Sequence, residues 1–597
     1  MLKYPKKPLI TERTPSDKIR QAALSLGLSE LQAKLVASRV TEADFSHDNM
    51  LEELQKIVFP KLQYLQHPEQ LKNAKQAAEL IADAIESQGK IVLATDYDTD
   101  GVTSAWVATR ALIDYFGVSP ERIEHMIGER KEGYGITEEV VNRILALEGS
   151  IDLVISADQG SSDEPRIKQL ADAGIKVCVT DHHQMTTEGA PPSAACTVNP
   201  QQAGCQYDKT VAGCFVIFLV MGQTRTELIR RQVIPDTTPS LKDLTQNIAL
   251  GTVADSVSLK SINNRAIVQA GLAAINQFKH PAWQALQKMN DNQGQPFNAE
   301  YLGFQVATRI NAASRVSDVT TAFKFLNASN FEQASSLLQQ LDQDNLDRRS
   351  QQEGMLRQAR ETAEALYHEN KFTLSIQMTG NAGIQGIIAS RIGEQYGVPT
   401  IAMTDLEDGY LAGSGRGIVS NIDLREAFQT MAERHSGLFK SMGGHKGAAG
   451  CMIPIEKFDV FSTLFEETIQ EQLNHTVPVP TIETDGQLAG WQLTPSLIQE
   501  LNLLEPYGRD WAKPLFSGVF EIQDLRPVGQ TKTHLSFKLR TDDRQIISAI
   551  FFNAKSTADA PDGFSIGEKV ECAYQPSLNT FYGKTSLQLK IVAMNTL

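Results

Sequence analysis

The chain of 597 residues is 41% hydrophobic and 21% charged, with a formal net charge of −15 at pH 7. This length favours about three or four domains, and the composition is that of an ordinary globular protein. No run of about 18 apolar residues occurs and the first residues lack the apolar stretch of a secretory signal, so we expect neither a membrane span nor a secretory signal. The acidic total argues against non-specific coating of duplex DNA, but it permits a single strand held in a local basic groove.

The cysteines indicate a reducing compartment. The six of them, at positions 178, 196, 205, 214, 451 and 572, form no C-x-x-C pair. The even spacing of Cys196, Cys205 and Cys214 is more often coincidence than zinc ligation. We therefore expect a cytoplasmic protein without structural disulfides.

Short apolar runs and helical patterns alternate in the first half of the chain. Residues 14–88 are predicted to be mostly helical, and the amphipathic segment 73–87 leads into the first run. Strands are expected at residues 91–94, 153–156, 177–179 and 197–198, with helices at 138–147 and 163–173 between them. Alternation of this kind is typical of βαβ units and predicts a parallel sheet.

Three carboxylates follow the first expected strand at alternate positions. These are Asp96, Asp98 and Asp100; Gly101 then ends the run, and residues 102–106 are expected to begin a helix. Open α/β sheets bind ligands at the carboxyl ends of their strands, and neighbouring carboxylates repel one another unless a hard cation such as Mg²⁺ or Mn²⁺ neutralises them. The alternative is a solvated turn rich in Asp.

Further polar residues follow the later apolar runs. Asp158 comes after residues 153–157, and the triplet Asp181, His182 and His183 comes after residues 177–180. Asp255 ends the apolar run 247–254, which we also interpret as a strand. A single triplet of this kind could be a helix start or a structural histidine, but four convergent strand ends favour a two-metal site.

Four segments resemble, in order and spacing, the motifs of the DHH phosphoesterase superfamily: T-D-Y-D-T-D-G, S-A-D-Q-G, T-D-H-H and G-T-V-A-D-S-V-S-L. The rest of the chain, from about residue 50 onward, is similar to the RecJ family of bacterial single-strand-specific 5′→3′ DNA exonucleases. That similarity rests on E-G-Y-G from residue 132, V-A-G from 211, R-I-N-A-A-S-R from 309, G-S-G-R from 413 and G-G-H-K-G-A-A-G from 443.

The resemblance implies an α/β multidomain protein. Its parts would be an N-terminal helical extension (1–45), a parallel-sheet DHH domain (46–319), a long helical connector (320–367), an α/β DHH-associated domain (368–472) and an OB-like β-barrel (473–597). The last part is also predicted independently to be mostly β, with strands at 519–525, 534–540, 546–552 and 587–592. Barrels of this type commonly bind single strands.

The metal and catalytic residues follow from the motifs and the resemblance together. Two ions, Mn²⁺ or Mg²⁺, are assigned to Asp98, Asp100, Asp158, His182 and Asp255, with Asp158 as the bridging ligand by family analogy and Asp96 as a ligand or its neighbour. His183 is expected to stabilise charge at the scissile phosphate or to protonate the leaving group. Asp181 is expected to orient a ligating imidazole.

Phosphate contacts are expected in glycine-rich and arginine-containing segments. Glycine lets backbone N–H groups approach an anion, and Arg matches phosphate geometry; tight turns are the alternative for the glycines. The candidates are Arg309, Asn311, Arg315, Arg391, Ser414, Arg416, Gly443, Gly444, His445 and Lys446. Tyr134 would stack on a base or belong to the core. A weaker C-terminal strand-binding face would include Trp511, Lys513, Arg526, Lys532, His534, Lys538 and Lys584.

The resemblance implies a metal-dependent 5′→3′ exonuclease that hydrolyses single-stranded DNA to 5′-mononucleotides in DNA repair and recombination. It implies partnership with a single-strand-binding protein and a helicase, and we expect a monomer. Departures from the family pattern concern substrate choice: Gln159 replaces Asn or Cys, Ser314 replaces Gly, and a Trp-His pair is absent near Asn381. The alternatives are a DHH phosphodiesterase for short RNA or small nucleotides, and a nucleic-acid-binding scaffold with weakened catalysis.

Overall fold

The structure, a computed structural model, describes residues 7–46, 49–290, 295–406, 408–419, 421–555, 557–581 and 584–597. By its internal contacts the chain forms two compact units. The first contains residues 16–348 together with 504–513, and the second contains the other described residues. No helix among the described residues is long and apolar enough to cross a bilayer. All six cysteines are free thiols.

The first unit is built on a five-stranded sheet in which every neighbouring pair is parallel, as predicted. In spatial order its strands are β3 (Ile123–Ile127), β2 (Lys90–Thr95), β4 (Ile151–Ala157), β5 (Lys176–Thr180) and β6 (Cys196–Val198). The expected strands at 91–94, 153–156, 177–179 and 197–198 are confirmed. β3 escaped prediction because it is an edge strand of half-polar sequence, I-E-H-M-I, with a partly exposed middle.

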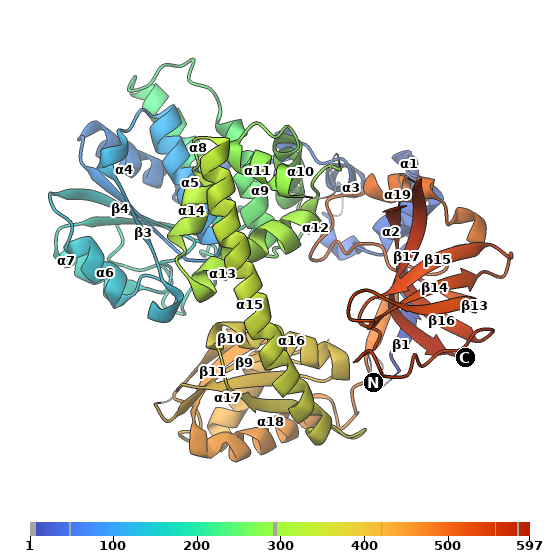
Figure 1. The fold of residues 1–597 in the computed structure, drawn as a ribbon. Helices are drawn as coiled ribbons and strands as arrows, with labels where there is room; N and C mark the ends of the chain where they lie inside the picture. The colour runs from blue at the N-terminus through green and yellow to red at the C-terminus, as the bar shows by residue number, and fades with distance from the viewer. Residues whose placement is uncertain are drawn as a thin grey trace. The chain divides into compact units, whose positions relative to one another are not determined.

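Helices cover both faces of this sheet. α6 (Glu138–Leu145) and α7 (Glu164–Asp172) lie on one face, and α4 (Ala74–Glu86), α5 (Thr99–Arg110) and α8 (Gly213–Arg230) lie on the other (Figure 1). The core under α6 and α7 joins Val92 and Val154 of the strands to Val140 and Ile167 of the helices. Burial on both faces explains the continuous apolar runs of the central strands.

The expected strand at residues 247–254 is wrong, because these residues form the helix α9 (Thr245–Ala254). Its residues from Asn247 to Thr252 are all buried, so no polar stripe marks the helical period. A short apolar run of this kind cannot be distinguished from a buried strand by periodicity. Asp255 therefore follows the C-terminus of a helix.

The remaining helices of the first unit flank this core. They are α1 (Asp17–Ser25), α2 (Glu30–Ala37), α3 (Met50–Val58), α10 (Ile262–Ile275), α11 (Pro281–Met289), α12 (Ala299–Tyr301), α13 (Ala307–Val316) and α14 (Thr320–Leu326). The 36-residue helix α15 (Phe331–Leu366) follows and continues into the second unit.

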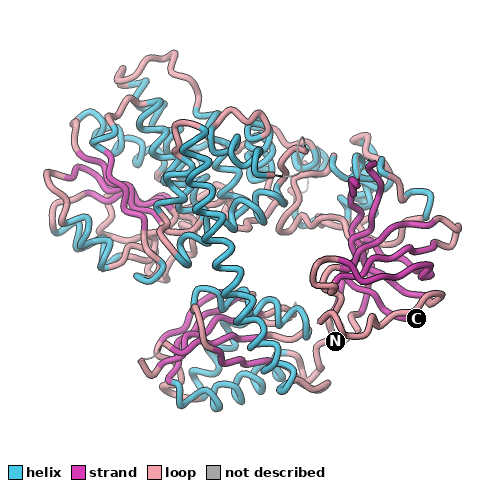
Figure 2. The backbone as a smooth tube through the Cα atoms, viewed as in Figure 1, coloured by secondary structure: helices cyan, strands magenta, loops and turns pink. Residues whose placement is uncertain are grey.

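The second unit holds a mixed sheet and a barrel, which appear as separate groups of strands in Figure 2. In the mixed sheet only β7 and β8 are parallel, and its strands in order are β10 (Ser441–His445), β11 (Ala448–Pro454), β9 (Tyr410–Arg416), β8 (Thr400–Asp405) and β7 (Leu374–Met378). The helices α16 (Gln385–Tyr396), α17 (Leu424–Arg434) and α18 (Phe458–Gln472) accompany it.

The C-terminal strands close into a barrel, which confirms the predicted β-barrel. In order they are β13 (Phe516–Val528), β14 (His534–Arg540), β15 (Ile546–Phe551), β17 (Lys584–Thr596) and β16 (Lys569–Phe581). The helix α19 (Pro495–Asn502) precedes them. The N-terminal segment is not entirely helical, since β1 (Leu9–Glu12) pairs in parallel with β12 (Thr481–Thr484).

Candidate metal centre

The carboxylates after β2 are placed by the start of α5. Asp98 is the N-cap: its Oδ1 accepts hydrogen bonds from the backbone N–H groups of Asp100 (2.8 Å) and Gly101 (3.1 Å). The helix therefore begins at Thr99, earlier than expected, because Asp98 satisfies its free N–H groups. A Cβ on Gly101 would lie 2.2 Å from the carbonyl oxygen of Asp96, so only glycine fits there.

Asp100 is held by the N-terminus of another helix. Its carboxylate accepts hydrogen bonds from the backbone N–H groups of Gly213 (2.7 Å) and Cys214 (2.9 Å) at the start of α8. A helix N-terminus favours negative charge. A Cβ on Gly213 would lie 2.6 Å from Oδ1 of Asp158, so this glycine allows α8 to approach both carboxylates. The contacts explain why a V-A-G segment accompanies the acidic motifs.

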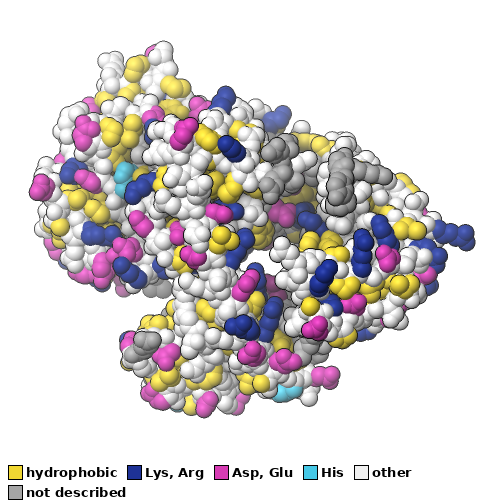
Figure 3. All heavy atoms as spheres, viewed as in Figure 1, with side chains coloured by type: hydrophobic (Ala, Val, Ile, Leu, Met, Phe, Trp, Pro, Cys, Tyr) yellow, Lys and Arg dark blue, Asp and Glu magenta, His cyan; other side chains and the backbone are white. Residues whose placement is uncertain are grey.

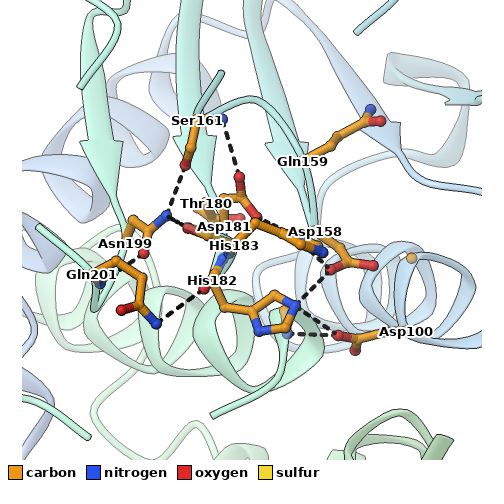
Figure 4. A network of polar contacts seen from close by, with 12 residues as sticks. Asp100, Asp158, Gln159, Ser161, Thr180, Asp181, His182, His183, Asn199 and Gln201 are labelled. Carbon is orange, nitrogen blue, oxygen red and sulfur yellow. Dashed lines mark hydrogen bonds and ion pairs between the residues drawn. The ribbon is translucent and has the colours of Figure 1, made fainter. Parts of the chain in front are cut away.

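His182 joins the carboxylates from different elements (Figure 4). Its Nε2 lies 3.2 Å from Oδ1 of Asp158, 3.6 Å from Oδ2 of Asp255 and 3.7 Å from Oδ2 of Asp100. Asp158 has a left-handed backbone (φ 62°) directly after β4, and its N–H donates to the carbonyl of Thr180. The predicted ligands Asp100, Asp158, His182 and Asp255 are thereby brought together.

The ligand atoms form three overlapping groups, each with all its atoms within 4.8 Å of one another. The groups are Asp158 with His182 and His183; Asp100 with His182 and Asp255; and Asp96 with Asp98 and Asp158. Within the part of the chain that the structure describes, Asp96 Oδ1, Asp158 Oδ1 and His182 Nε2 are buried without a hydrogen-bond partner. Buried polar atoms are normally satisfied, so this oxygen-rich donor set fits hard divalent cations.

The protonation of these groups also fits a cation site. Burial and then the charges of neighbouring carboxylates raise the pKa of Asp158 and Asp255 well above the ordinary value. The same causes raise the pKa of Asp96 to about 8. Burial lowers the pKa of His182, which favours the neutral imidazole that a metal requires. A bound cation would offset the repulsion and let the carboxylates ionise.

Asp181 positions His183 rather than the ring of His182. Its Oδ1 accepts from Nδ1 of His183 (2.9 Å), and toward His182 it reaches only the backbone N–H (2.7 Å). Burial would lower the pKa of His183, but the hydrogen bond and charge of Asp181 outweigh it and raise the pKa to about 9. Burial would likewise raise the pKa of Asp181, but His183 and His182 hold it below its ordinary value. The contact with Asp181 therefore favours the cationic form of His183.

Tyr134 lies beside this histidine. Its hydroxyl is 2.8 Å from Nδ1 of His183 and donates to the carbonyl of Asp158 (3.0 Å). The residue is 48% exposed, so it does not belong to the core. Its side chain is therefore partly open to solvent, while its hydroxyl lies against His183.

Sequence reasoning missed several polar residues that support the pair of histidines. Asn199 donates to Ser161 Oγ (2.8 Å) and to the carbonyl of His183 (2.9 Å). Gln201 donates to the carbonyl of His182 (3.3 Å; Figure 4). Asn199 and Gln201 directly follow β6, so the rule that the sheet's ligands lie at strand ends could have found them. The side chain of Gln159 points away from the histidines in Figure 4.

The R-I-N-A-A-S-R segment on α13 has mixed roles. Asn311 accepts from the N–H and the hydroxyl of Thr99 (both 2.9 Å), which ties α13 to the start of α5. Arg309 is paired with Asp342 (2.8 Å) and donates to the carbonyl of Gln305. These two expected phosphate contacts therefore have structural partners.

Arg315 belongs to a cluster of cations that the sequence did not reveal. Burial and the charges of Arg130 and Arg348 lower the pKa of Arg315 to about 10. The guanidinium of Arg130 lies 4.4 Å from the ring centre of Tyr97, between Asp96 and Asp98 in the chain. The position of Arg130 just before E-G-Y-G was the available signal. Three guanidinium groups close together favour an anion.

The second unit carries the other expected phosphate residues on adjacent strands. In register, Gly443 pairs with Gly450 and Gly450 with Ser414, while His445 pairs with Ala448 and Ala448 with Arg416. The Gly443–Lys446 stretch is exposed. Gly444 (φ 138°) is required, because a Cβ there would lie 2.5 Å from the carbonyl oxygen of Ala448.

Two arginines are close to these strands: Arg416 lies on β9, and Arg391 lies on the helix α16. Nη1 of Arg416 donates to Oγ of Ser414 (3.1 Å) and to the carbonyl of Gly415 (2.8 Å). A Cβ on Gly386 would lie 2.4 Å from Nη2 of Arg416, so α16 packs closely on it. Arg391, on the same helix, is exposed.

The expected C-terminal strand-binding face is wrong in one part. Trp511 is fully buried, and its ring lies 4.2 Å from the guanidinium of Arg265 in the first unit. Lys513 is paired with Glu300 of the same unit. His534 accepts from the N–H of Asn553 (3.0 Å) and Lys538 donates to Ser548 (2.8 Å) on the barrel. The side chain of Lys584 is outside the described residues.

Fold and site together define a DHH-type metal-dependent phosphoesterase. The DHH family N-terminal domain matches residues 90–252, the DHHA1 domain matches 369–471 and the RecJ OB domain matches 484–593. The single-stranded-DNA-specific exonuclease RecJ of Haemophilus influenzae is 32% identical over 540 residues, which cover 89% of this chain and 92% of that protein. Its namesake in Escherichia coli is 31% identical over 88% of this chain and 90% of that protein. The chain belongs to the RecJ family.

Solved structures agree with this assignment. The crystal structure of RecJ from Thermus thermophilus in complex with Mn²⁺ superposes with a TM-score of 0.76 at 25% identity, covering 99% of this chain and 79% of that chain. A crystal structure of exonuclease RecJ bound to manganese gives a TM-score of 0.55 at 28% identity, covering 69% of this chain and 96% of that chain.

Proposed function

We propose that this protein is a metal-dependent exonuclease that hydrolyses single-stranded DNA from the 5′ end to 5′-mononucleotides, with Mn²⁺ or Mg²⁺ as cofactor. The observation that carries the proposal is the set of buried atoms Asp96 Oδ1, Asp158 Oδ1 and His182 Nε2 at the edge of a parallel sheet, which have no hydrogen-bond partner among the described residues. Family membership supports the activity, and the motif resemblance supports the polarity and the product.

Asp98, Asp100, Asp158, His182 and Asp255 would hold two ions, with Asp96 beside them. When bound, divalent ions stabilise charge on the phosphoryl oxygens and lower the pKa of water for attack. The protein's own task is to keep these donors in place: α8 fixes Asp100, and the α5 N-cap fixes Asp98.

His183 acts on the substrate side of the reaction. Asp181 and Tyr134 fix its ring, and its raised pKa keeps a proton on it at neutral pH. A cationic imidazole beside the metal ligands can stabilise charge on the phosphate or donate its proton to the leaving oxygen. His183 therefore serves as the charge stabiliser or general acid.

Single-stranded DNA is recognised mainly through its phosphates. In the first unit the cluster of Arg130, Arg315 and Arg348 provides positive charge close to Asp98. In the second unit the exposed glycine strands with Arg416 and Lys446 offer N–H groups and cations. Lys and Arg side chains also gather over the barrel on the face drawn in Figure 3, among Asp and Glu. Local basic surfaces therefore coexist with the acidic total.

The cellular setting is part of the same proposal. We place the enzyme in the cytoplasm as a monomer, working in DNA repair and recombination with a single-strand-binding protein and a helicase. The six free thiols fit a reducing compartment. The partners and pathway rest on family resemblance.

The test compares 5′-labelled and 3′-labelled strands of DNA and RNA, incubated with the purified protein and Mn²⁺, beside an Asp158→Ala control. We expect labelled mononucleotide to appear first from the 5′-labelled DNA and to disappear in EDTA and in the control. Mononucleotide released first from the 3′ label would refute the polarity. Preferred cleavage of RNA would favour the phosphodiesterase alternative, and metal-independent or absent cleavage would favour the scaffold.

A further inference from the structure

Ten residues of the C-terminal half, 504–513, pack with the first unit instead of the second. Arg265 on α10 is fully buried and holds the beginning of this segment. Its guanidinium donates to the carbonyl groups of Leu504 (3.0 Å), Glu505 (3.3 Å) and Pro506 (3.0 Å). A buried Arg that donates to several carbonyl groups costs much to displace, because each lost bond would leave a charged donor unsatisfied.

The end of the segment is fixed by further contacts. The ring of Trp511 stacks 4.2 Å from the guanidinium of Arg265. Nε of Arg39 donates to the carbonyl of Ala512 (2.7 Å), and Lys513 is paired with Glu300. The segment is therefore fastened at both ends to the unit that contains the metal centre.

The middle of the segment reaches the residues that follow the ligand Asp255. The N–H of Leu259 donates to the carbonyl of Arg509 (2.9 Å), and Nη1 of Arg509 donates to the carbonyl of Ser256 (3.4 Å). A Cβ on Gly508 would lie 2.7 Å from the side chain of Leu259, so glycine permits this approach. Arg509 thus contacts Ser256, the residue that directly follows the proposed metal ligand Asp255.

We propose that Arg509 contacts a phosphate of the single-stranded DNA substrate beside the metal centre, as a further substrate-positioning residue of the proposed exonuclease. The side chain is exposed, and its hydrogen bond to Ser256 is long for an N–H donor. A guanidinium has five N–H donors in a fork that matches phosphate. Lys513, the other cation of the segment, already has a carboxylate partner.

The acidic surroundings explain why a cation at position 509 would help substrate binding. Asp100, Asp158 and Asp255 converge near Ser256, and their negative charge repels a phosphodiester wherever bound cations do not neutralise it. An Arg at the rim offsets that repulsion without competing for the ions, because it cannot be a ligand. Arg509 lies outside the motifs quoted above, and its place beside Ser256 follows from the tertiary structure.

The test uses Arg509→Gln and Arg509→Lys, with Lys168→Gln as the matched loss of one charge; Lys168 is paired with Asp172 on the outer helix α7. Binding of a fluorescent single strand is measured by anisotropy over a series of salt concentrations, and KM and kcat are measured in Mn²⁺. We expect Arg509→Gln to weaken binding and raise KM about tenfold, with less effect on kcat. The slope of log K against log salt is negative, and its absolute value should decrease by about 0.7. Arg509→Lys should restore the slope, and Lys168→Gln should change none of these.

A strand with one neutral methylphosphonate at successive positions from the 5′ end identifies the phosphate. One position should weaken binding to the wild type and have no further effect on Arg509→Gln. An unchanged salt slope in Arg509→Gln, or additive effects at every methylphosphonate position, would overturn the proposal. If the wild type binds strands without cutting them, the proposed function fails while the binding data still decide on Arg509; unfolding temperatures of the variants exclude misfolding as a cause.

Discussion

The carboxyl edge of the parallel sheet and the glycine strands β9 to β11 both carry proposed contacts to the substrate, but they are built in opposite ways. At the sheet edge Asp100 and Asp158 are 1% exposed, and the charge of Asp100 helps to raise the pKa of Asp158. In the second unit the Gly443–Lys446 stretch is exposed to solvent. Buried carboxylates that repel one another are stabilised by a bound cation. Exposed N–H groups are instead hydrated by water when no ligand is bound. The first region should therefore be intolerant of change and dependent on metal, and the second should be tolerant and sensitive to salt.

The largest effect is expected from Asp158→Asn. The amide keeps the shape but removes the charge at the centre of the ligand groups, so we expect cleavage to fall by about 10³-fold or more. In metal-free protein the same change relieves repulsion with Asp100, so the unfolding temperature should rise. A fall in unfolding temperature together with retained activity would show that this edge is not a cation site.

His183→Ala should reduce kcat by about 10²-fold to 10⁴-fold. A group with a raised pKa of about 9 is protonated below that pH, so a general acid gives a rate that declines as pH rises through about 9. The variant should lose this basic limb, while Mn²⁺ binding should persist. If the limb is unchanged in His183→Ala, His183 is not the acid.

A pair of glycine variants compares the two regions directly. A Cβ on Gly213 would lie 2.6 Å from Asp158 Oδ1, whereas a Cβ on Gly443 meets nothing within 4 Å. Gly213→Ala should raise the Mn²⁺ concentration for half-maximal activity about 10-fold to 100-fold, as for other changes beside metal ligands. Gly443→Ala should leave that concentration unchanged. Equal responses would remove the contrast between the regions.

Metal removal should make stability depend on pH. The pKa of Asp96 is raised to about 8 in the folded protein, so the native state binds more protons than the unfolded state between about pH 4 and pH 8. Stability in EDTA should therefore fall as pH rises through this window. Mn²⁺ should flatten the dependence, which calorimetry at several pH values can measure. A rise of stability with pH in EDTA would contradict the buried-carboxylate interpretation.

The smallest effect is expected from Arg416→Gln in the second unit. Loss of one phosphate contact should weaken strand binding several-fold at low salt and much less at high salt, because exposed charges are screened. Metal dependence should stay as in the wild type. Binding that is equally weak at all salt concentrations would indicate a structural role for Arg416 against Gly386 of α16.

The sheet could be predicted because its central strands are buried on both faces. The runs before Asp96, Asp158 and Asp181 are continuous and apolar, and a parallel sheet brings their carboxyl ends to one edge. The predicted strand at residues 247–254 was wrong for the same reason, since a fully buried helix and a fully buried strand have the same apolar sequence pattern.

The finer parts of the site could not be predicted because tertiary contacts decide them. The sequence does not distinguish the adjacent histidines, yet of their two rings only that of His183 is hydrogen-bonded to Asp181. Arg130 and Arg509 lie outside the charged motifs, and only folding brings them near Tyr97 and Ser256. Trp511 shows the opposite error: it was expected on a strand-binding face, but its ring is buried against Arg265.

The most direct measurement is anomalous X-ray diffraction from crystals of the protein soaked in Mn²⁺, with Asp158→Asn crystals as the control. We expect two manganese peaks at the sheet edge, both in contact with Asp158, one of them also with Nε2 of His182. The control should lose at least one peak. No peak at this edge, or peaks bound only by exposed carboxylates elsewhere, would contradict the proposal that the buried acidic edge is a two-metal centre.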